Sequence, residues 1–149
     1  MNIEWSTFWS AVSGIATSIG AVAIWFMRKQ LRFEAWLKAQ EIWTIPDFIQ
    51  SRGFVFAKLD NESVIWNVDE ENKALDVCRK MDEFARLIPY LPKQTAVSIW
   101  GIPFAKAWVI LEPVVKRERD KCSWSDKWSA FEQLGKASLK RYPKIERKK

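Results

Sequence analysis

The 149 residues are enough for one modest domain, and their net charge of +6 is concentrated after residue 116. The chain contains no histidine, which excludes Ser-His-Asp triads, histidine general bases, histidine metal ligands and histidine pH switches. Its two cysteines, Cys78 and Cys122, form neither a disulfide framework nor a CxxC pair, and they suit a reducing compartment at least as well as an oxidising one.

The first feature along the chain is a run of 23 uncharged residues, 5–27, between Glu4 and Arg28. As a helix this run is about 34 Å long, against about 30 Å for the hydrocarbon core of a bilayer. Trp5, Trp9 and Trp25 lie near its ends, where indole rings suit the head-group layer. A signal peptide begins with cations and ends in small residues, and a small domain rarely buries a helix that is apolar all round. We therefore predict a retained transmembrane helix at 5–27.

Basic residues close to the predicted span indicate its orientation. Four cations follow the run, whereas only the terminal amine precedes it: Arg28, Lys29, Arg32 and Lys38. Cations concentrate on the cytoplasmic side of a span, which predicts an N-terminus outside and a cytoplasmic C-terminal domain. The same cations could contact anionic lipid head groups, or they could form a solvated flank that only sets the topology.

Small and hydroxyl side chains recur at a spacing of four inside the predicted span. Such spacing lets two helix backbones approach closely, which predicts self-association or docking onto another membrane helix. A weakly hydrophobic anchor without helix partners is the alternative. The candidate packing residues are Ser10, Gly14, Thr17, Ser18 and Gly20.

The rest of the chain is expected to be all-α, because no stretch alternates with period two. We expect a basic stalk helix at 28–43, a cytoplasmic helical domain at 44–142 and a basic tail at 143–149. The stalk is expected to present four apolar side chains near one side, Phe33, Trp36, Leu37 and Trp43. Inside the domain, helices are predicted at 47–59, at 69–87, at 94–100, at 104–119 and from a capping box at Ser123 and Asp126 to about Tyr142.

Two apolar stripes predict the core of this domain. One stripe on the helix at 69–87 includes Cys78, Met81 and Phe84, so Cys78 is expected to be a core residue rather than a nucleophile. The other stripe comprises Ala107, Trp108, Leu111 and Val115. The acidic residues of the first of these helices are expected to form a solvated face: Asp69, Glu70, Glu71, Asp76, Asp82 and Glu83.

The layout resembles that of an uncharacterised family of small bacterial single-pass membrane proteins with a helical cytoplasmic domain of unknown function. The resemblance is carried by the span, the "RKQLR" exit, the tryptophan-bearing linker helix, the "MDEFARLIPYLPK" segment with its "WGIPFAKAW" helix, and the terminal helix. It implies location in a bacterial inner (plasma) membrane. It supplies no catalytic signature.

The sequence contains no Gly-rich phosphate loop, no GxSxG and no Cys/His metal spacing, so we expect no catalytic, cofactor or metal residues. The favoured hypothesis is a non-enzymatic membrane-anchored module that binds a protein partner or itself in a regulatory or scaffold role. The alternatives are an oligomerising, membrane-damaging effector of a bacterial conflict or phage-defence system, and an enzyme with unfamiliar carboxylate chemistry. The basic tail favours lipid over nucleic acid as a ligand, because the chain is expected to be tethered to a membrane.

Overall fold

The structure, a computed structural model of the chain, describes residues 5–59, 66–91 and 93–145; within its helices, the side chains of residues 6–9, 11, 15 and 93–96 fall outside this description. The described part contains helices and no strand, which confirms the predicted all-α class. The elements follow in the order α1 Trp5–Thr44, α2 Pro46–Ala57, α3 Val68–Ala85, η1 Ile88–Tyr90, α4 Lys93–Cys122, α5 Ser129–Arg141 and η2 Pro143–Ile145.

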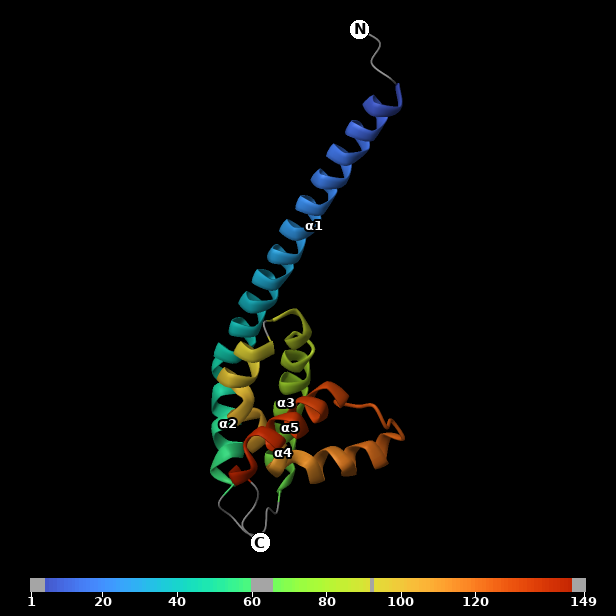
Figure 1. Cartoon of the computed structure of the whole chain (residues 1–149). Coiled ribbons are helices and arrows are strands. Elements are labelled where there is room, and N and C mark those ends of the chain that lie inside the picture. Colours follow the sequence, from blue (N-terminus) through green and yellow to red (C-terminus); the bar gives the residue numbers. More distant parts are fainter. Residues whose placement is uncertain (1–4, 60–65, 92, 146–149) are drawn as a thin grey trace.

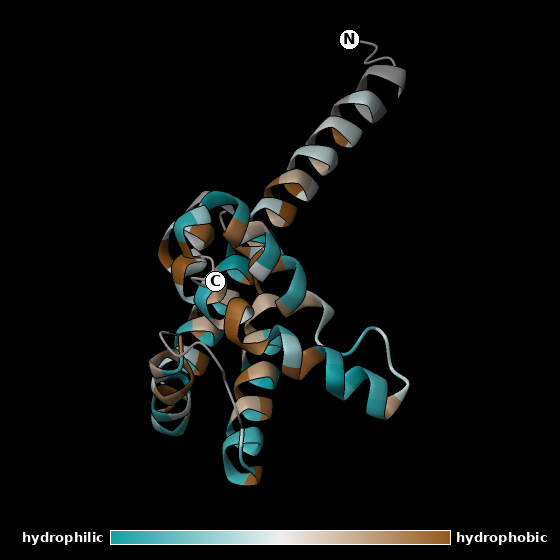
Figure 2. Cartoon of the chain, turned by 90° about the horizontal axis from the view of Figure 1, so that it is seen from below, coloured by the Kyte–Doolittle hydropathy of each residue, from teal (hydrophilic) through white to brown (hydrophobic). Residues whose placement is uncertain are grey.

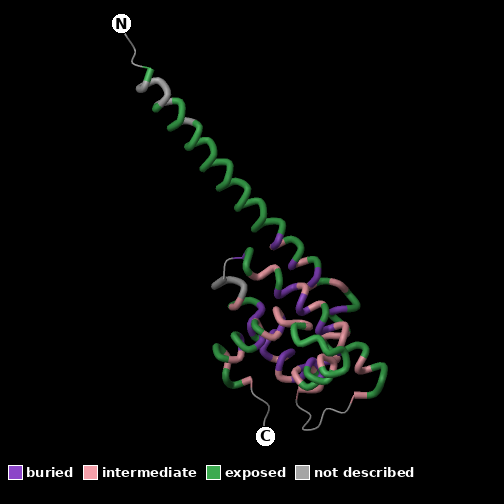
Figure 3. The backbone as a smooth tube through the Cα atoms, turned by 90° about the vertical axis from the view of Figure 1, so that its right-hand side faces the viewer, coloured by how far each residue is buried: buried purple, intermediate pink, exposed green. Residues whose placement is uncertain are grey.

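Helix α1 is one continuous helix of 40 residues that projects far beyond the other helices (Figure 1). Every residue from 16 to 34 is exposed, and the first buried residue of the described chain is Ala35. From there Ala35, Ala39 and Ile42 enter the core, so α1 is buried only where it meets the bundle (Figure 3). Burial therefore begins inside the predicted stalk of 28–43, about two and a half turns before the expected boundary at residue 44.

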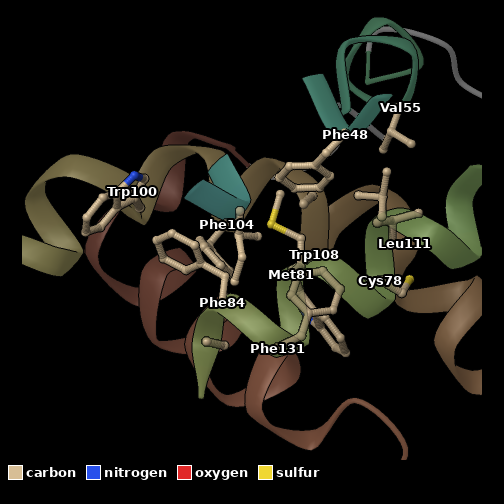
Figure 4. Packing of buried hydrophobic residues seen from close by; sticks show 14 of the residues in the cluster. Phe48, Val55, Cys78, Met81, Phe84, Trp100, Phe104, Trp108, Leu111 and Phe131 are labelled. Atoms are coloured by element: carbon tan, nitrogen blue, oxygen red, sulfur yellow. The ribbon is translucent and has the colours of Figure 1, made fainter. Parts of the chain in front are cut away.

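An aromatic cluster joins α1 to the rest of the core. The Phe84 ring on α3 lies 4.8 Å from the Trp100 ring and 5.4 Å from the Phe104 ring, both on α4. Trp43 at the end of α1 lies 5.3 Å from Phe84. Phe84 therefore lies at the centre of this cluster, while Phe131 of α5 packs on Phe104 from the other side (Figure 4).

Local sequence signals account for the start of α2 and α3. Pro46 occupies the first turn of α2, where the missing N–H costs nothing. Asn67 caps α3, since its Oδ1 accepts from the Glu70 N–H at 2.9 Å and Glu70 Oε2 accepts from the Asn67 N–H at 3.1 Å. The predicted helices at 47–59 and 69–87 are accordingly found at almost the predicted places.

The predicted break between 94–100 and 104–119 is wrong, because α4 runs without interruption through Pro103 and Pro113. Trp100, Phe104 and Trp108 are all buried on one face, and this packing offsets the backbone hydrogen bond that Pro103 removes. The helix instead changes direction where its colour passes from gold to orange (Figure 1). The predicted buried face of Ala107, Trp108, Leu111 and Val115 is confirmed.

The predicted start of the last helix at Ser123 is also wrong. Helix α5 begins at Ser129, after a turn in which Ser123 and Trp128 have positive φ values of 52° and 60°. Its first turn is capped from another helix: the Phe131 N–H donates to Oδ1 of the buried Asp82 on α3 at 3.0 Å. Oδ2 of the same carboxylate accepts from Arg86 Nε at 2.9 Å. The expected solvated role of Asp82 is thus wrong.

Helices α4 and α5 approach each other so closely that one position admits only glycine. A Cβ built on Gly135 would lie 2.6 Å from Cβ of Trp108, which is far inside van der Waals contact. The Trp108 and Phe131 rings pack edge to face 5.4 Å apart beside this contact. The apolar face of α5 therefore packs directly on the Trp108 side chain of α4.

Replacing Phe84 by alanine should destabilise the domain by about 3–5 kcal/mol, through lost transfer free energy and the cavity left among the aromatic rings. The measurement is chemical unfolding of residues 28–149, a segment that keeps the buried turns of α1. Tyr90→Ala is the control, because the Tyr90 side chain is exposed and its loss should leave the unfolding midpoint nearly unchanged. Similar midpoints for the two variants would contradict the placement of Phe84 at the centre of the core.

Replacing Asp82 by alanine should cost about 1–3 kcal/mol in the same segment, because the buried Phe131 N–H loses its acceptor. Asp82→Asn keeps an oxygen acceptor and should cost less than Asp82→Ala. Asp76→Ala on the same helix is the control, since it removes only a surface ion pair with Arg79 and should change stability by less than about 1 kcal/mol. Equal losses for Asp76→Ala and Asp82→Ala would rule out the capping role.

Candidate functional site

The predicted site residues all lie on the projecting part of α1 or just beyond it. Their described side chains are exposed: Trp5, Ser10, Gly14, Thr17, Ser18, Gly20, Trp25, Arg28, Lys29, Arg32 and Lys38. The Trp9 side chain falls outside the described residues. The exposed surface of this part of α1 is pale to brown in Figure 2, whereas teal turns cover much of the domain. The candidate site is therefore an exposed helix surface rather than a cavity.

Large apolar side chains are exposed along this surface at every turn. They include Ile19, Val22, Ile24, Trp25, Phe26 and Met27, each more than half exposed. A soluble monomer rarely leaves a contiguous apolar patch of this length in water. The surface therefore needs an apolar environment that the single chain does not provide.

Three hydroxyls within the apolar run, those of Ser13, Thr17 and Ser18, are satisfied inside the helix itself. Thr17 Oγ1 donates to the Ser13 carbonyl at 2.8 Å, and Ser18 Oγ donates to the Gly14 carbonyl at 2.9 Å. Hydroxyls that bond back to the preceding turn can enter an apolar medium at low cost. Around Gly14 and Gly20, an added Cβ would meet nothing within 4 Å, so both glycines line open surface.

Cationic residues mark the lower end of the apolar run. Lys29 Nζ lies 5.1 Å from the centroid of the Trp25 ring, which places a cation and an indole at the same level of the helix. Arg28 and Arg32 extend the basic segment by another turn and are exposed. The arrangement has the composition of a membrane–water boundary.

Among the described residues, one helix is long and apolar enough to cross a membrane by length and composition alone, Val97–Cys122 of α4. Half of its most apolar window is buried inside the domain, as is common for a core helix. This finding concerns the described residues, and the run from 5 to 27 contains six side chains that fall outside them.

The two thiols have opposite environments. Cys78 is buried on α3, and burial together with the nearby Asp82 carboxylate raises the pKa of its thiol far above the ordinary value. Cys122 is exposed at the end of α4, 3.5 Å from Glu118 Oε1. The expected core role of Cys78 agrees with its position, since a buried protonated thiol is a poor nucleophile.

Surface hollows among the described residues include one beside α3 and one beside η2. The first, of about 490 Å³, lies between α3 and the turn before α5 and is lined by Asp76, Arg79, Glu118, Lys127 and Trp128 among others. Lys127 Nζ lies 3.0 Å from Glu118 Oε1, and this hydrogen bond lowers the pKa of Glu118 and raises that of Lys127. The charged groups here are paired with one another, Lys127 with Glu118 and Arg79 with Asp76.

The other hollow, of about 380 Å³, lies beside η2. Its floor is apolar, with Ile102, Tyr142 and Ile145, and its rim carries three cations, Lys106, Arg141 and Lys144. The described part of the chain contains no group of three or more His, Cys, Asp or Glu residues placed to hold a metal ion. The described residues thus include hollows of mixed polar and apolar character, besides the long apolar surface of α1.

Sequence reasoning missed the residues that fasten the turn before α5. Arg119 Nε donates to the Lys127 carbonyl at 2.8 Å, and its Nη1 donates to Glu132 Oε2 at 2.7 Å. No local sequence pattern predicts these contacts, because they join residues that are 8 and 13 positions apart across a turn. Asp82 gave only a misleading signal, since its spacing with Arg86 is that of a surface ion pair.

Comparison with known proteins adds no family to these observations. No protein-family model matches the chain, and neither a curated protein nor a solved structure matches it. The resemblance to bacterial single-pass membrane proteins therefore stays a prediction.

The two thiols should differ sharply in reactivity toward an aromatic disulfide reagent at pH 8. Cys122 should react rapidly in the folded chain, whereas Cys78 should react only after unfolding, because it is buried and its raised pKa keeps it protonated. Spectrophotometric counting should find one fast thiol in the native protein and two in denaturant. The variant Cys122→Ser should have none in the native protein, and a fast thiol in that variant would show that Cys78 is accessible.

Proposed function

We propose that this chain is a non-enzymatic, single-pass membrane-anchored module, in which the first part of α1 crosses the bilayer and the helical bundle binds a protein partner or a second copy. The observation that carries the proposal is the projecting helix: residues 16–34 are all exposed, and the uncharged run of 5–27 makes up most of the projection. Its length of about 34 Å matches a bilayer core of about 30 Å.

Two physical arguments favour a bilayer as the environment of this helix. An isolated helix in water is only marginally stable, and one with apolar side chains all round would aggregate. In lipid, the backbone is satisfied within the helix, and the hydroxyls of Thr17 and Ser18 already have intrahelical acceptors. The alternative span, in α4, would have to remove Phe104, Trp108 and Leu111 from the core of the domain.

The cations at the end of the run support the proposed orientation. Arg28, Lys29 and Arg32 are exposed directly after the apolar segment, at its end nearer the bundle. Basic residues close to a span remain in the cytoplasm, so the N-terminus is outside and the bundle is cytoplasmic. In a bacterial cell, the proposed location is the inner membrane.

The proposed anchor predicts that alkaline carbonate leaves the full-length chain in the membrane pellet, because a spanning helix is not released as a surface-bound helix is. Ile19→Arg places a charge near the bilayer centre at a cost of about 2.5–3.5 kcal/mol, so a large share of that variant should become extractable. Ile99→Arg is the matched control, because Ile99 is exposed on the domain and should have no effect.

The orientation is tested by labelling cells with a thiol reagent that does not cross membranes. Cys122 should be labelled only after the cells are permeabilised, since it lies at the end of α4 in the bundle. Recovery of the wild-type chain in the carbonate supernatant would end the anchor proposal, and labelling of Cys122 in intact cells would reverse the topology.

A further inference from the structure

Helix α1 has one face that points toward the bundle and an opposite face that points away from it. At about 100° per residue, Gly14, Thr17 and Ser18 lie within about 60° of the direction in which Ala39 enters the core. The small-residue face therefore points to the same side as the bundle. Two copies that met through this face would have both bundles between their helices.

The opposite face of α1 stays free as far as the end of the helix. Four residues on it, Phe26, Gln30, Phe33 and Leu37, lie about 120–180° from the direction of Ala39. All four are exposed, and Phe33 and Leu37 are exposed by 61% and 51%. The predicted grouping of Phe33 and Leu37 with Trp36 and Trp43 is thus divided, because the two tryptophans pack on the core while the other two face away from it.

A bilayer does not cover all of this face. Leu37 lies about 14 Å along the helix beyond Arg28, whereas the head-group layer extends only about 5–8 Å beyond the hydrocarbon on each side. Leu37 is therefore an apolar residue on the aqueous side of the proposed anchor, whereas Phe33, about 7.5 Å beyond Arg28, lies at the outer edge of the head-group layer. The face that continues from Phe33 to Leu37 leaves the bilayer, and a protein surface that runs alongside α1 would cover it.

The spacing and charges of this face fit a second copy of α1. Phe26, Gln30, Phe33 and Leu37 are separated by four, three and four residues, which is the spacing of a coiled-coil seam, and Gln30 supplies the kind of polar seam residue that fixes register. In a parallel pair, the flanking residue directly before one seam position meets the residue directly after the next seam position of the other helix, so Lys29 meets Glu34 of the second copy. Within the part of the chain that the structure describes, neither residue has an ion pair of its own: Glu34 accepts from Gln30, and Lys29 lies over Trp25.

We infer that two copies of this chain associate in parallel along the outer face of α1, through the seam Phe26, Gln30, Phe33 and Leu37 and through Lys29–Glu34 pairs between the copies. The inference rests on the proposed anchor, because a common membrane is what makes the two helices parallel and brings equal residues to the same depth. Self-association then uses the face opposite the bundle, and the two bundles lie on the outside of the pair.

Disulfide crosslinking of the full-length chain in isolated membranes tests this arrangement. In a Cys122→Ser background, Phe33→Cys and Leu37→Cys should form dimers under a mild oxidant, because identical seam residues face each other across a parallel pair. Leu31→Cys is the matched control: Leu31 is 53% exposed and lies at nearly the same depth, but on the side of the bundle. It should stay monomeric. Equal dimer yields at positions 31, 33 and 37, or no dimer at any of them, would overturn the inference.

Two further variants, each carried in the Leu37→Cys background, test the register and the choice of face. Glu34→Lys should lower the dimer yield by about 1.5- to 5-fold, and the exchange Lys29→Glu with Glu34→Lys should restore it. Gly14→Leu should leave the yield unchanged, whereas association through the small-residue face predicts a loss. Failure of the charge exchange to restore dimers, or loss of dimers in Gly14→Leu, would refute the proposed seam.

Carbonate extraction of the same membranes separates this inference from the anchor on which it rests. A chain that stays in the pellet without crosslinking refutes the seam and leaves the anchor standing. A chain that is extracted refutes the anchor and, with it, the reason for parallel pairing.

Discussion

The burial of the last turns of α1 in the aromatic core is the interaction on which the rest of the structure depends. Ala35, Ala39 and Ile42 bring the α1 backbone close to the bundle, and Trp43 reaches Phe84 at 5.3 Å and Phe104 at 6.3 Å. Arg52 closes this end of the cluster, with its guanidinium 3.9 Å from the centroid of the Trp43 ring. The lower end of α1 is thus a core helix. Because the helix has no break between residues 5 and 44, the direction of every exposed side chain above Ala35 is set by this burial.

The start of α5 is held by polar contacts that cross between helices. Asp82 of α3 caps the first turn of α5, and Arg119 of α4 fastens the turn that leads into it. These contacts take the place of the local cap that Ser123 and Asp126 do not form. A buried carboxylate needs partners for its lone pairs, and Asp82 finds them in the Phe131 N–H and the Arg86 guanidinium. The start of α5 is therefore determined by α3, which lies 49 residues away along the chain.

The sequence predicts what is encoded locally and misses what is encoded by packing. Helices α2 and α3 were predicted almost at their bounds, since the apolar stripe of α3 has helical spacing within the helix itself and Pro46 stands at the first turn of α2. The Asn67–Glu70 box that caps α3 is a finding of the structure. The continuity of α4 could not be predicted, since a proline normally ends a helix and only the burial of Trp100 and Phe104 on either side of Pro103 overcomes that cost. On α1, the sequence identified the apolar run and its cations. It could not separate Phe33 and Leu37 from Trp36 and Trp43, because both sets follow helical spacing and only the bundle decides which set is buried.

A helix that is anchored at one end and buried at the other couples the two environments mechanically. With α1 continuous and its lower turns packed against α2, α3 and η1, rotation of the helix about its axis must carry the bundle with it. If the first part of α1 lies in a bilayer, its outer face would contact a neighbouring helix in the membrane. Phe33 and Leu37 continue the same face of α1 toward the bundle. A contact made in the membrane would then orient the hollows of the domain that lie beside η2 and before α5 relative to the second copy. Because the bundle is fixed on one side of α1, pairing of two helices in the membrane would also fix the relative orientation of the two domains.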